Sequence, residues 1–321
     1  MKKTLVALAA VAVTGGAFAQ ATLTGDVAYG FTSSTAANST VSGFGLEAAD
    51  LYFNISEDIE GVGKLDANIN IDAAESGRAS GVQSGDIQMS LTTASGIKLS
   101  GGSTQGASYL SQGVASAGTA YEWNLSGKIT AARTNNDFVA VSAPLMEGVK
   151  AGYTHTEADV SIGTGSAAAL GAATQSYDTF SLDYAAGPLA VNVQARTYNG
   201  VVAASETYKQ SRSRFAAAYD LGVAKIGAGV EATNFSYGNT QSDTAISISI
   251  PLGKLNIGGQ IAQKATSGSA TSSSNYTRTG SIFGGTYNLS KRTYVVGQVW
   301  SYDAGNTTNT TGYGLAVYNT F

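Results

Sequence analysis

The sequence predicts an all-β protein, folded as a 16-stranded antiparallel transmembrane β-barrel. A strand ending recurs along the chain, apolar and polar residues alternate in the segments between, and short turns alternate with long, soft loops. Together these features are typical of a sheet that closes on itself with one apolar and one polar face.

The clearest copies of the strand ending carry two aromatic residues four positions apart, each pair followed by a turn. The pairs are Phe180 with Tyr184, Phe215 with Tyr219, and Phe283 with Tyr287. In an extended strand this spacing puts both rings on one face. Each tyrosine then lies at a rim, just before the chain reverses, which is where a membrane interface favours aromatic side chains.

Weaker copies of the ending fill the gaps between these pairs. The eight endings begin at residues 53, 87, 139, 180, 215, 246, 283 and 317. Apart from the long step between 87 and 139, they recur about every 35 residues, which is two strands of about ten residues, one tight turn and one longer loop. Eight endings therefore predict sixteen strands.

Period-2 alternation is clear in residues 65–72, 189–196 and 255–262. Ten strand residues at ~3.3 Å each, tilted by ~45°, cover ~23 Å, close to the ~25 Å apolar band of an outer-membrane barrel. Short reversals such as Pro251–Gly253 alternate with long loops, expected at residues 33–42, 158–176, 265–275 and 304–311. A β-propeller also repeats at about 40 residues, but it offers no reason for tyrosines at a rim.

The first nineteen residues are predicted to be a cleaved signal peptide rather than part of the fold. Lys2 and Lys3 precede an apolar run, and Ala17–Ala19 fits a small-residue cleavage site. Residues 20–321 then form a single barrel domain with no linker.

Composition narrows the function classes. The chain has no cysteine, so it offers neither a disulfide framework nor a thiolate metal site. Charged residues are only 12% of the chain, and they are spread unevenly. Residues 20–103 hold ten acids and three bases, whereas residues 196–321 hold five acids and ten bases. In a closed barrel this asymmetry would put opposite charges on opposite walls.

The one long step points to residues 102–136 as an unusually long loop. Loops of this length are uncommon unless they are functional. Either it is a floppy external loop, or it folds into the lumen and narrows it, because sixteen strands enclose an aqueous hole. We expect the second, which makes Glu122 and Arg133 candidate residues of a constriction.

Several segments resemble those of a known family, the Gram-negative general diffusion porins of the β-proteobacterial type. Residues 21–30 are similar to that family's first strand, residues 55–65 to its first tight hairpin, and residues 287–294 to another well-marked hairpin. The terminal Phe321 resembles the aromatic residue recognised by the outer-membrane assembly machinery. The resemblance implies a homotrimer whose third external loop folds inward. Where that loop often carries several carboxylates in the family, this chain has only Glu122 before Asp137.

Alternation predicts which charged side chains enter the pore. Since Phe215 and Tyr219 face outward, Arg212 and Arg214 face inward. The same reasoning predicts a basic wall made of Arg196, Arg212, Arg214, Lys225 and Arg278. The facing acids would be Asp26, Asp66, Asp72 and Asp86. The alternative is that these bases lie at the pore mouths, where they bind lipopolysaccharide phosphates or no ligand.

Catalysis is not expected. The only histidine is His155, and no Gly-x-Ser-x-Gly, phosphate-loop or dinucleotide motif is present. The acidic run Glu57–Glu60 is read as a solvated turn rather than a cation site. We expect a passive channel for ions and small hydrophilic solutes in the cell outer membrane. Its expected neighbours are membrane lipid and lipopolysaccharide, with no cofactor and no nucleic acid. A substrate-specific channel and a structural or adhesive barrel are the alternatives.

Overall fold

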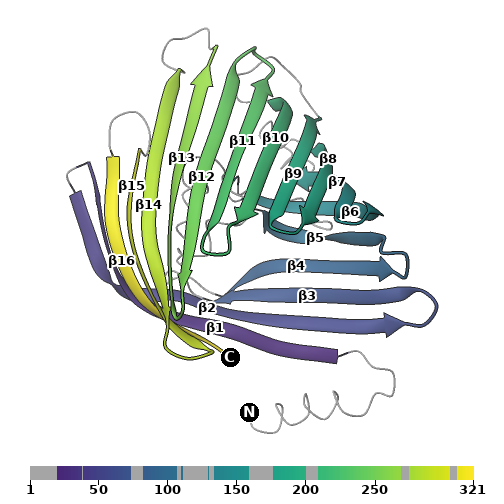
Figure 1. Cartoon of the computed structure of the whole chain (residues 1–321), viewed down its shortest axis with the longest axis horizontal. Helices are drawn as coiled ribbons and strands as arrows, with labels where there is room; N and C mark the ends of the chain where they lie inside the picture. The colour runs from purple at the N-terminus through teal and green to yellow at the C-terminus, as the bar shows by residue number, and fades with distance from the viewer. Residues whose placement is uncertain are drawn as a thin grey trace.

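The computed structural model describes residues 20–37, 39–73, 82–106, 110, 129, 134–158, 176–199, 209–268, 275–303 and 309–321. Within these residues the chain forms a closed barrel of sixteen strands in which each strand pairs with its neighbours in sequence and β1 pairs with β16 (Figure 1). Every pairing is antiparallel, as predicted. The described residues include no helix that is long and apolar enough to cross a membrane.

The strands have the following bounds: β1 Gln20–Ala36, β2 Ser39–Ile59, β3 Gly63–Ala73, β4 Val82–Thr93, β5 Lys98–Gly106, β6 Thr134–Met146, β7 Val149–Ala158, β8 Tyr177–Ala186, β9 Leu189–Tyr198, β10 Lys209–Asp220, β11 Lys225–Phe235, β12 Thr240–Leu252, β13 Leu255–Ser267, β14 Tyr276–Asn288, β15 Thr293–Asp303 and β16 Asn309–Thr320.

The barrel closes where the two ends of the described chain meet. β1 and β16 pair from Asp26 opposite Thr320 to Thr35 opposite Thr311. Beyond that ladder, the Gly25 amide donates to the Phe321 carbonyl over 3.1 Å, and the Phe321 amide donates to the Gly25 carbonyl over 2.9 Å. Closure leaves no sheet edge with unpaired backbone groups, which a bilayer would not tolerate.

The two faces of the sheet differ sharply in exposure. On β13, Gln260 is 2% exposed while the next residue, Ile261, is 65% exposed. On β10, Arg214 is 9% exposed and Phe215 is 50% exposed. Side chains on the concave inner face crowd one another, whereas apolar side chains on the convex face point away from the protein. The predicted alternation is therefore confirmed, with polar residues inward and apolar residues outward.

The predicted rim tyrosines are confirmed as well. Tyr184, Tyr219 and Tyr287 are exposed on the outer face, close to the ends of β8, β10 and β14. Tight turns follow each of these strands. In two of the tight reversals, after β8 and after β12, a glycine takes the left-handed backbone conformation, with φ of 55° at Gly187 and 68° at Gly253.

One predicted loop is wrong. Residues 33–42 were expected to form a long loop, but β1 runs to Ala36 and β2 begins at Ser39. The segment is mostly Ser, Thr and Ala, and its β-branched residues Thr35, Thr40 and Val41 favour strands. Aromatic contacts between the two strands add to this, with the Phe31 and Phe44 rings 4.9 Å apart in an edge arrangement. The hairpin therefore extends well past the point where its small polar residues suggested a loop.

Candidate functional site

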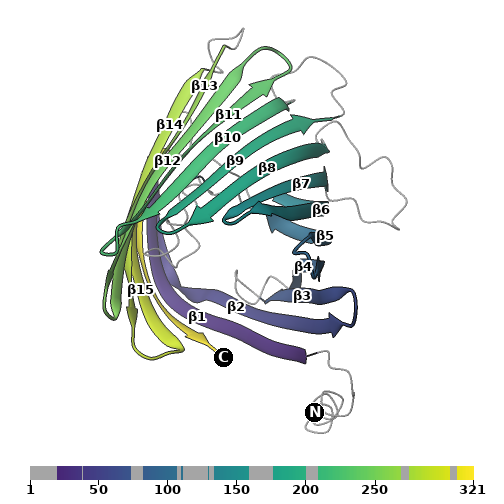
Figure 2. The same ribbon diagram turned by 45° about the vertical axis from the view of Figure 1, so that its right-hand side comes forward.

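The inner wall of the barrel is the candidate functional site, and its charged residues fall into two groups on opposite sides. Seven strands lie between β2 and β10 in either direction around the sixteen-stranded ring, so the two strands face each other across the lumen. Both views show β1–β4 on one side and β9–β12 on the other (Figures 1 and 2).

A basic cluster lies on β9 and β10. Arg196 and Arg212 occupy directly opposed positions in the ladder between these strands. Such a pair of like charges is unfavourable in isolation. Arg196 is held in place because its Nε donates to the Thr179 hydroxyl over 2.9 Å and its guanidinium lies 3.9 Å from the centre of the Tyr177 ring. Stacking on an aromatic face stabilises a cation without neutralising its charge.

The basic cluster continues into a row of charged residues of both signs on the neighbouring strands. Arg212 forms an ion pair with Glu231 on β11, with 3.3 Å between Nη1 and Oε1. Glu231 is also opposite Arg214 on one side and Asp243 on the other. The row then continues through Lys264 on β13 to Arg278 on β14, and the Arg278 guanidinium lies 4.7 Å from the centre of the Tyr276 ring.

An acidic cluster lies on β1, β2 and β3. Asp26, Asp50 and Asp72 occupy one row across the three strands. The Tyr52 hydroxyl lies 3.1 Å from an Asp26 oxygen and 3.3 Å from an Asp50 oxygen, so it serves both carboxylates. Three adjacent carboxylates give this wall a concentrated negative charge, opposite the arginines of β9 and β10.

The structure brings together most of the predicted wall residues but places two of them elsewhere. Lys225 begins β11 beside the β10–β11 turn and pairs with Asp220 over 3.4 Å. Asp66 lies near the β2–β3 turn and pairs with Lys64 over 3.0 Å. Asp86 lies on β4, next to the strand that carries Asp72. Glu122 and Arg133 lie outside the described residues.

Several residues of these walls were missed by the sequence reasoning: Asp50, Tyr52, Glu231, Asp243 and Lys264. Alternation could have found all of them. Leu51 and Val230 point outward, so Asp50 and Glu231, the residues next to them, had to point inward. No signal in the sequence indicated which residues pair across strands. The register between β10 and β11 brings Arg212 within ion-pair distance of Glu231.

Two described residues of the long segment between β5 and β6 lie against the inner wall. Leu110 and Ile129 are 1% and 2% exposed, and they cluster with Ala245, Ala262, Ile282 and Trp300 on β12–β15. A Cβ added to Gly229 would overlap the Leu110 carbonyl oxygen. The small side chains of this part of the wall thus leave room for Leu110.

The single histidine faces away from the lumen. His155 lies opposite the outward Val139, and its Nδ1 and Nε2 are 2.7 Å from Asp178 and 2.9 Å from Glu157. Among the residues the structure describes, no group of three or more His, Cys, Asp or Glu could hold a metal ion.

Comparisons with known proteins agree with this architecture. The sequence profile of the Gram-negative porin family matches residues 4–307. No match is found among curated protein sequences. Similar solved structures include the anion-selective porin from Comamonas acidovorans, which is 18% identical with a TM-score of 0.70, the alignment covering 95% of this chain and 100% of that one.

Two further solved structures are similar at lower identity. A loop L8 deletion mutant of OmpT, an outer membrane protein of Vibrio cholerae, is 12% identical with a TM-score of 0.64, covering 94% of this chain and 99% of that one. A mutant of Rh. blastica porin is 14% identical with a TM-score of 0.63, covering 94% and 100%. At these identities the likeness concerns the fold, whereas the family match concerns the sequence itself. The chain therefore belongs to the Gram-negative porin family, and it is an outer-membrane channel for passive diffusion.

Proposed function

We propose that this porin filters solutes by an electric field directed across its lumen. The acidic side is formed by Asp26, Asp50 and Asp72, with Asp86 beside them. The basic side is formed by Arg196, Arg212, Arg214 and Arg278. The observation that carries the proposal is the position of these two groups on strands half a barrel apart.

The physical argument rests on the low-dielectric wall around a narrow aqueous path. Charges of opposite sign on facing walls orient the dipole of a passing solute and steer cations and anions along different sides. Glu231 and Asp243 reduce the net positive charge of the basic side, since Arg212 already forms an ion pair with Glu231 at 3.3 Å. Lys225 and Asp66 lie beside short turns, so in this proposal they act at the pore mouth.

The segment 102–136 is proposed to narrow the lumen, with Glu122 and Arg133 adding charge to the constriction. Support comes from Leu110 and Ile129, which lie within this segment and are buried against inward residues of β12–β15. An apolar contact on an otherwise polar wall would hold the segment in place without occupying the charged groups.

The proposal also covers the export, the oligomeric state and the membrane contacts of the channel. Residues 1–19 would be a cleaved export signal, and the mature chain would form a homotrimer. Its outer face would contact membrane lipid and lipopolysaccharide. The exposed apolar side chains of that face, such as Ile246 and Phe283, support the lipid contact.

Reversal potentials in planar bilayers under a salt gradient test the filter. Arg212→Ala removes a positive charge from the basic side and should shift the permeability ratio toward cations. Asp26→Asn removes a negative charge from the opposite side and should shift it toward anions. Lys254→Ala is a matched control, because Lys254 is exposed on the β12–β13 turn and should leave the ratio unchanged.

Opposite shifts for the two wall variants would support the proposal. Equal ratios for both variants and the wild type would remove these residues from the filter.

A further inference from the structure

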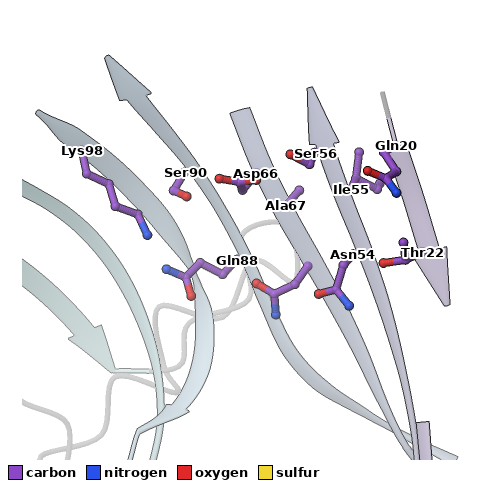
Figure 3. A pocket seen from close by; sticks show the side chains of 11 residues that line it. Gln20, Thr22, Asn54, Ile55, Ser56, Asp66, Ala67, Gln88, Ser90 and Lys98 are labelled. Atoms are coloured by element: carbon purple, nitrogen blue, oxygen red, sulfur yellow. The ribbon is translucent and has the colours of Figure 1, made fainter. Parts of the chain in front are cut away.

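A polar hollow of about 350 Å³ opens on the inner wall where β2–β5 approach their short turns (Figure 3). Most of its lining residues carry inward side chains by strand register, among them Asn54, Asn68 and Gln88. We propose that this hollow is a binding subsite for neutral, hydroxyl-rich solutes, of which short oligosaccharides are the natural class. This inference names a solute class for the proposed channel. It rests on the proposed function in one respect, that solutes cross this lumen.

The hollow is lined by two parallel rows of hydrogen-bonding side chains. Thr22, Asn54, Asn68 and Gln88 form one row across β1–β4. Gln20, Ser56, Asp66 and Ser90 form the next. Neighbours within a row are separated by the strand spacing of ~4.8 Å, and the rows by two residues, or ~6.6 Å. Figure 3 shows the labelled polar side chains, Asn54 and Gln88 among them, projecting from adjacent strands, whereas Ile55 and Ala67 belong to the opposite face by register.

The amide groups of this hollow are not used by the protein itself. In the described part of the chain, the side chains of Asn54 and Gln88 make no hydrogen bond, and Asn68 makes only a long one of 3.5 Å to Asn70. Several other inward amides of the described barrel are hydrogen-bonded within the protein, whereas the buried amide of Gln298 has no hydrogen-bond partner. Asn192 donates to Asp183 over 2.6 Å, Gln241 to Asp243 over 2.7 Å, and Gln260 to Ser247 over 3.0 Å.

The gathering of Asn54, Asn68 and Gln88 around one open hollow indicates a ligand-facing surface. Each amide offers two donors and one acceptor group, and a sugar hydroxyl offers one donor and two lone pairs. Asn54 and Gln88 can therefore either donate hydrogen bonds to hydroxyl groups or accept hydrogen bonds from them. A solute hydroxyl can take the place of a water molecule at such an amide, because it offers the same kinds of hydrogen-bonding group.

The charge of the hollow argues against an ionic ligand. Its one carboxylate, on Asp66, is already paired with Lys64 at 3.0 Å. Lys98 is the one base among the lining residues, on β5. The hollow also lies on β1–β5, away from the arginine cluster of β9 and β10. Neutral hydroxyl-rich solutes fit this balance better than phosphates or carboxylates do.

Binding should be weak and fast, since the hollow opens to water and each neutral hydrogen bond only exchanges one partner for another. A dissociation constant on the order of 1 mM, or weaker, is expected, which suits a channel that must release its solute. Such binding is measurable as a saturable reduction of ion current.

The test is single-channel recording of the full chain with maltotriose added from about 1 to 100 mM, the range around the expected dissociation constant. The current should fall along a saturating curve. Tetraethylene glycol, a probe with mainly ether oxygens, should reduce it only in proportion to solution viscosity. The paired variant Asn54→Ala/Gln88→Ala should weaken the maltotriose effect about tenfold or more, as two lost hydrogen-bonding groups predict.

Gln194→Ala on β9 is the matched control, an inward amide outside the hollow, and it should keep the wild-type curve. Open-channel conductance and reversal potential without sugar report whether each variant folds and filters ions. A current that falls equally with maltotriose and the glycol, or a maltotriose effect that the paired variant retains, would overturn the subsite. Neither result would alter the ion-selectivity test, so the two proposals can fail separately.

Discussion

Residue-scale chemistry on the basic wall depends on partners that neutralise some arginines and only position others. Arg196 stacks on Tyr177 and keeps its full charge toward the lumen. Arg212 instead pairs with Glu231, and both side chains are mostly buried, at 11% and 8% exposure. A pair with so little exposure is screened less by water than a surface pair, so its loss should be felt in stability.

Glu231→Gln should lower the free energy of unfolding by roughly 1.5–3 kcal/mol, the worth of one hydrogen bond to a charged group. It should also move the permeability ratio toward anions, because Arg212 loses its counter-charge. Urea unfolding of the refolded protein in lipid vesicles measures the first effect, and reversal potentials measure the second.

A double-mutant cycle separates the pair from its surroundings. Arg212→Gln and the double variant complete the cycle. If the two single losses simply add, the ion pair seen at 3.3 Å contributes nothing to stability.

At the scale of single strands, the alternation of faces carries most of the fold. β3 shows it plainly, since Ile69 faces outward and Asn68 faces the lumen. The sequence allowed this assignment because a strand has only two faces, and a strand that turned the other way would put asparagines into lipid.

Ile69→Lys should cost ~2–4 kcal/mol, because it puts a charge on the lipid face near the middle of the strand. Asn68→Lys should cost little, because the same charge then points into water. Folding yield into vesicles and urea unfolding compare the two. Equal losses would contradict the assigned faces.

The small-residue part of the wall on β11–β13 offers a second test between neighbours on one strand. Gly229→Val would press on the Leu110 carbonyl and push Leu110 off Ala245 and Ala262. We expect greater open-channel current noise and faster proteolysis within residues 102–136. Ala228→Val also introduces a valine, but on the outward face of the same strand, and should behave as the wild type. Unchanged noise in Gly229→Val would show that this contact does not hold the segment.

For the molecule as a whole, function depends on closure, which sets β1–β4 opposite β9–β12 across water (Figure 2). A field between the two sides acts over a distance that salt controls. The Debye length is about 10 Å at 0.1 M salt and about 3 Å at 1 M.

The permeability ratios of the wild type, Arg212→Ala and Asp26→Asn should therefore differ most near 0.1 M KCl and converge near 1 M, where the Debye length is only about 3 Å. Recording the three channels across this range tests the field directly. Differences that persist undiminished in 1 M KCl would point to a steric filter instead.

The amino-acid pattern alone determined the number of strands, their antiparallel order, the rim tyrosines and the face of each wall residue. These are local properties, since period-2 alternation and turn chemistry involve neighbours in sequence. The family was indicated separately, by the resemblance of residues 21–30, 55–65 and 287–294 to known segments. Even so, residues 33–42 were misread, because Ser and Thr suit both loops and strands that extend beyond a membrane.

Partnerships between distant residues needed the tertiary structure. Register between strands decides that Arg212 meets Glu231, that Tyr52 serves two carboxylates, and that Lys225 pairs with Asp220 beside a turn. Closure decides which walls face each other and which amides stay free. The physical reason is that alternation specifies only inward or outward, while register and curvature specify what each inward group meets.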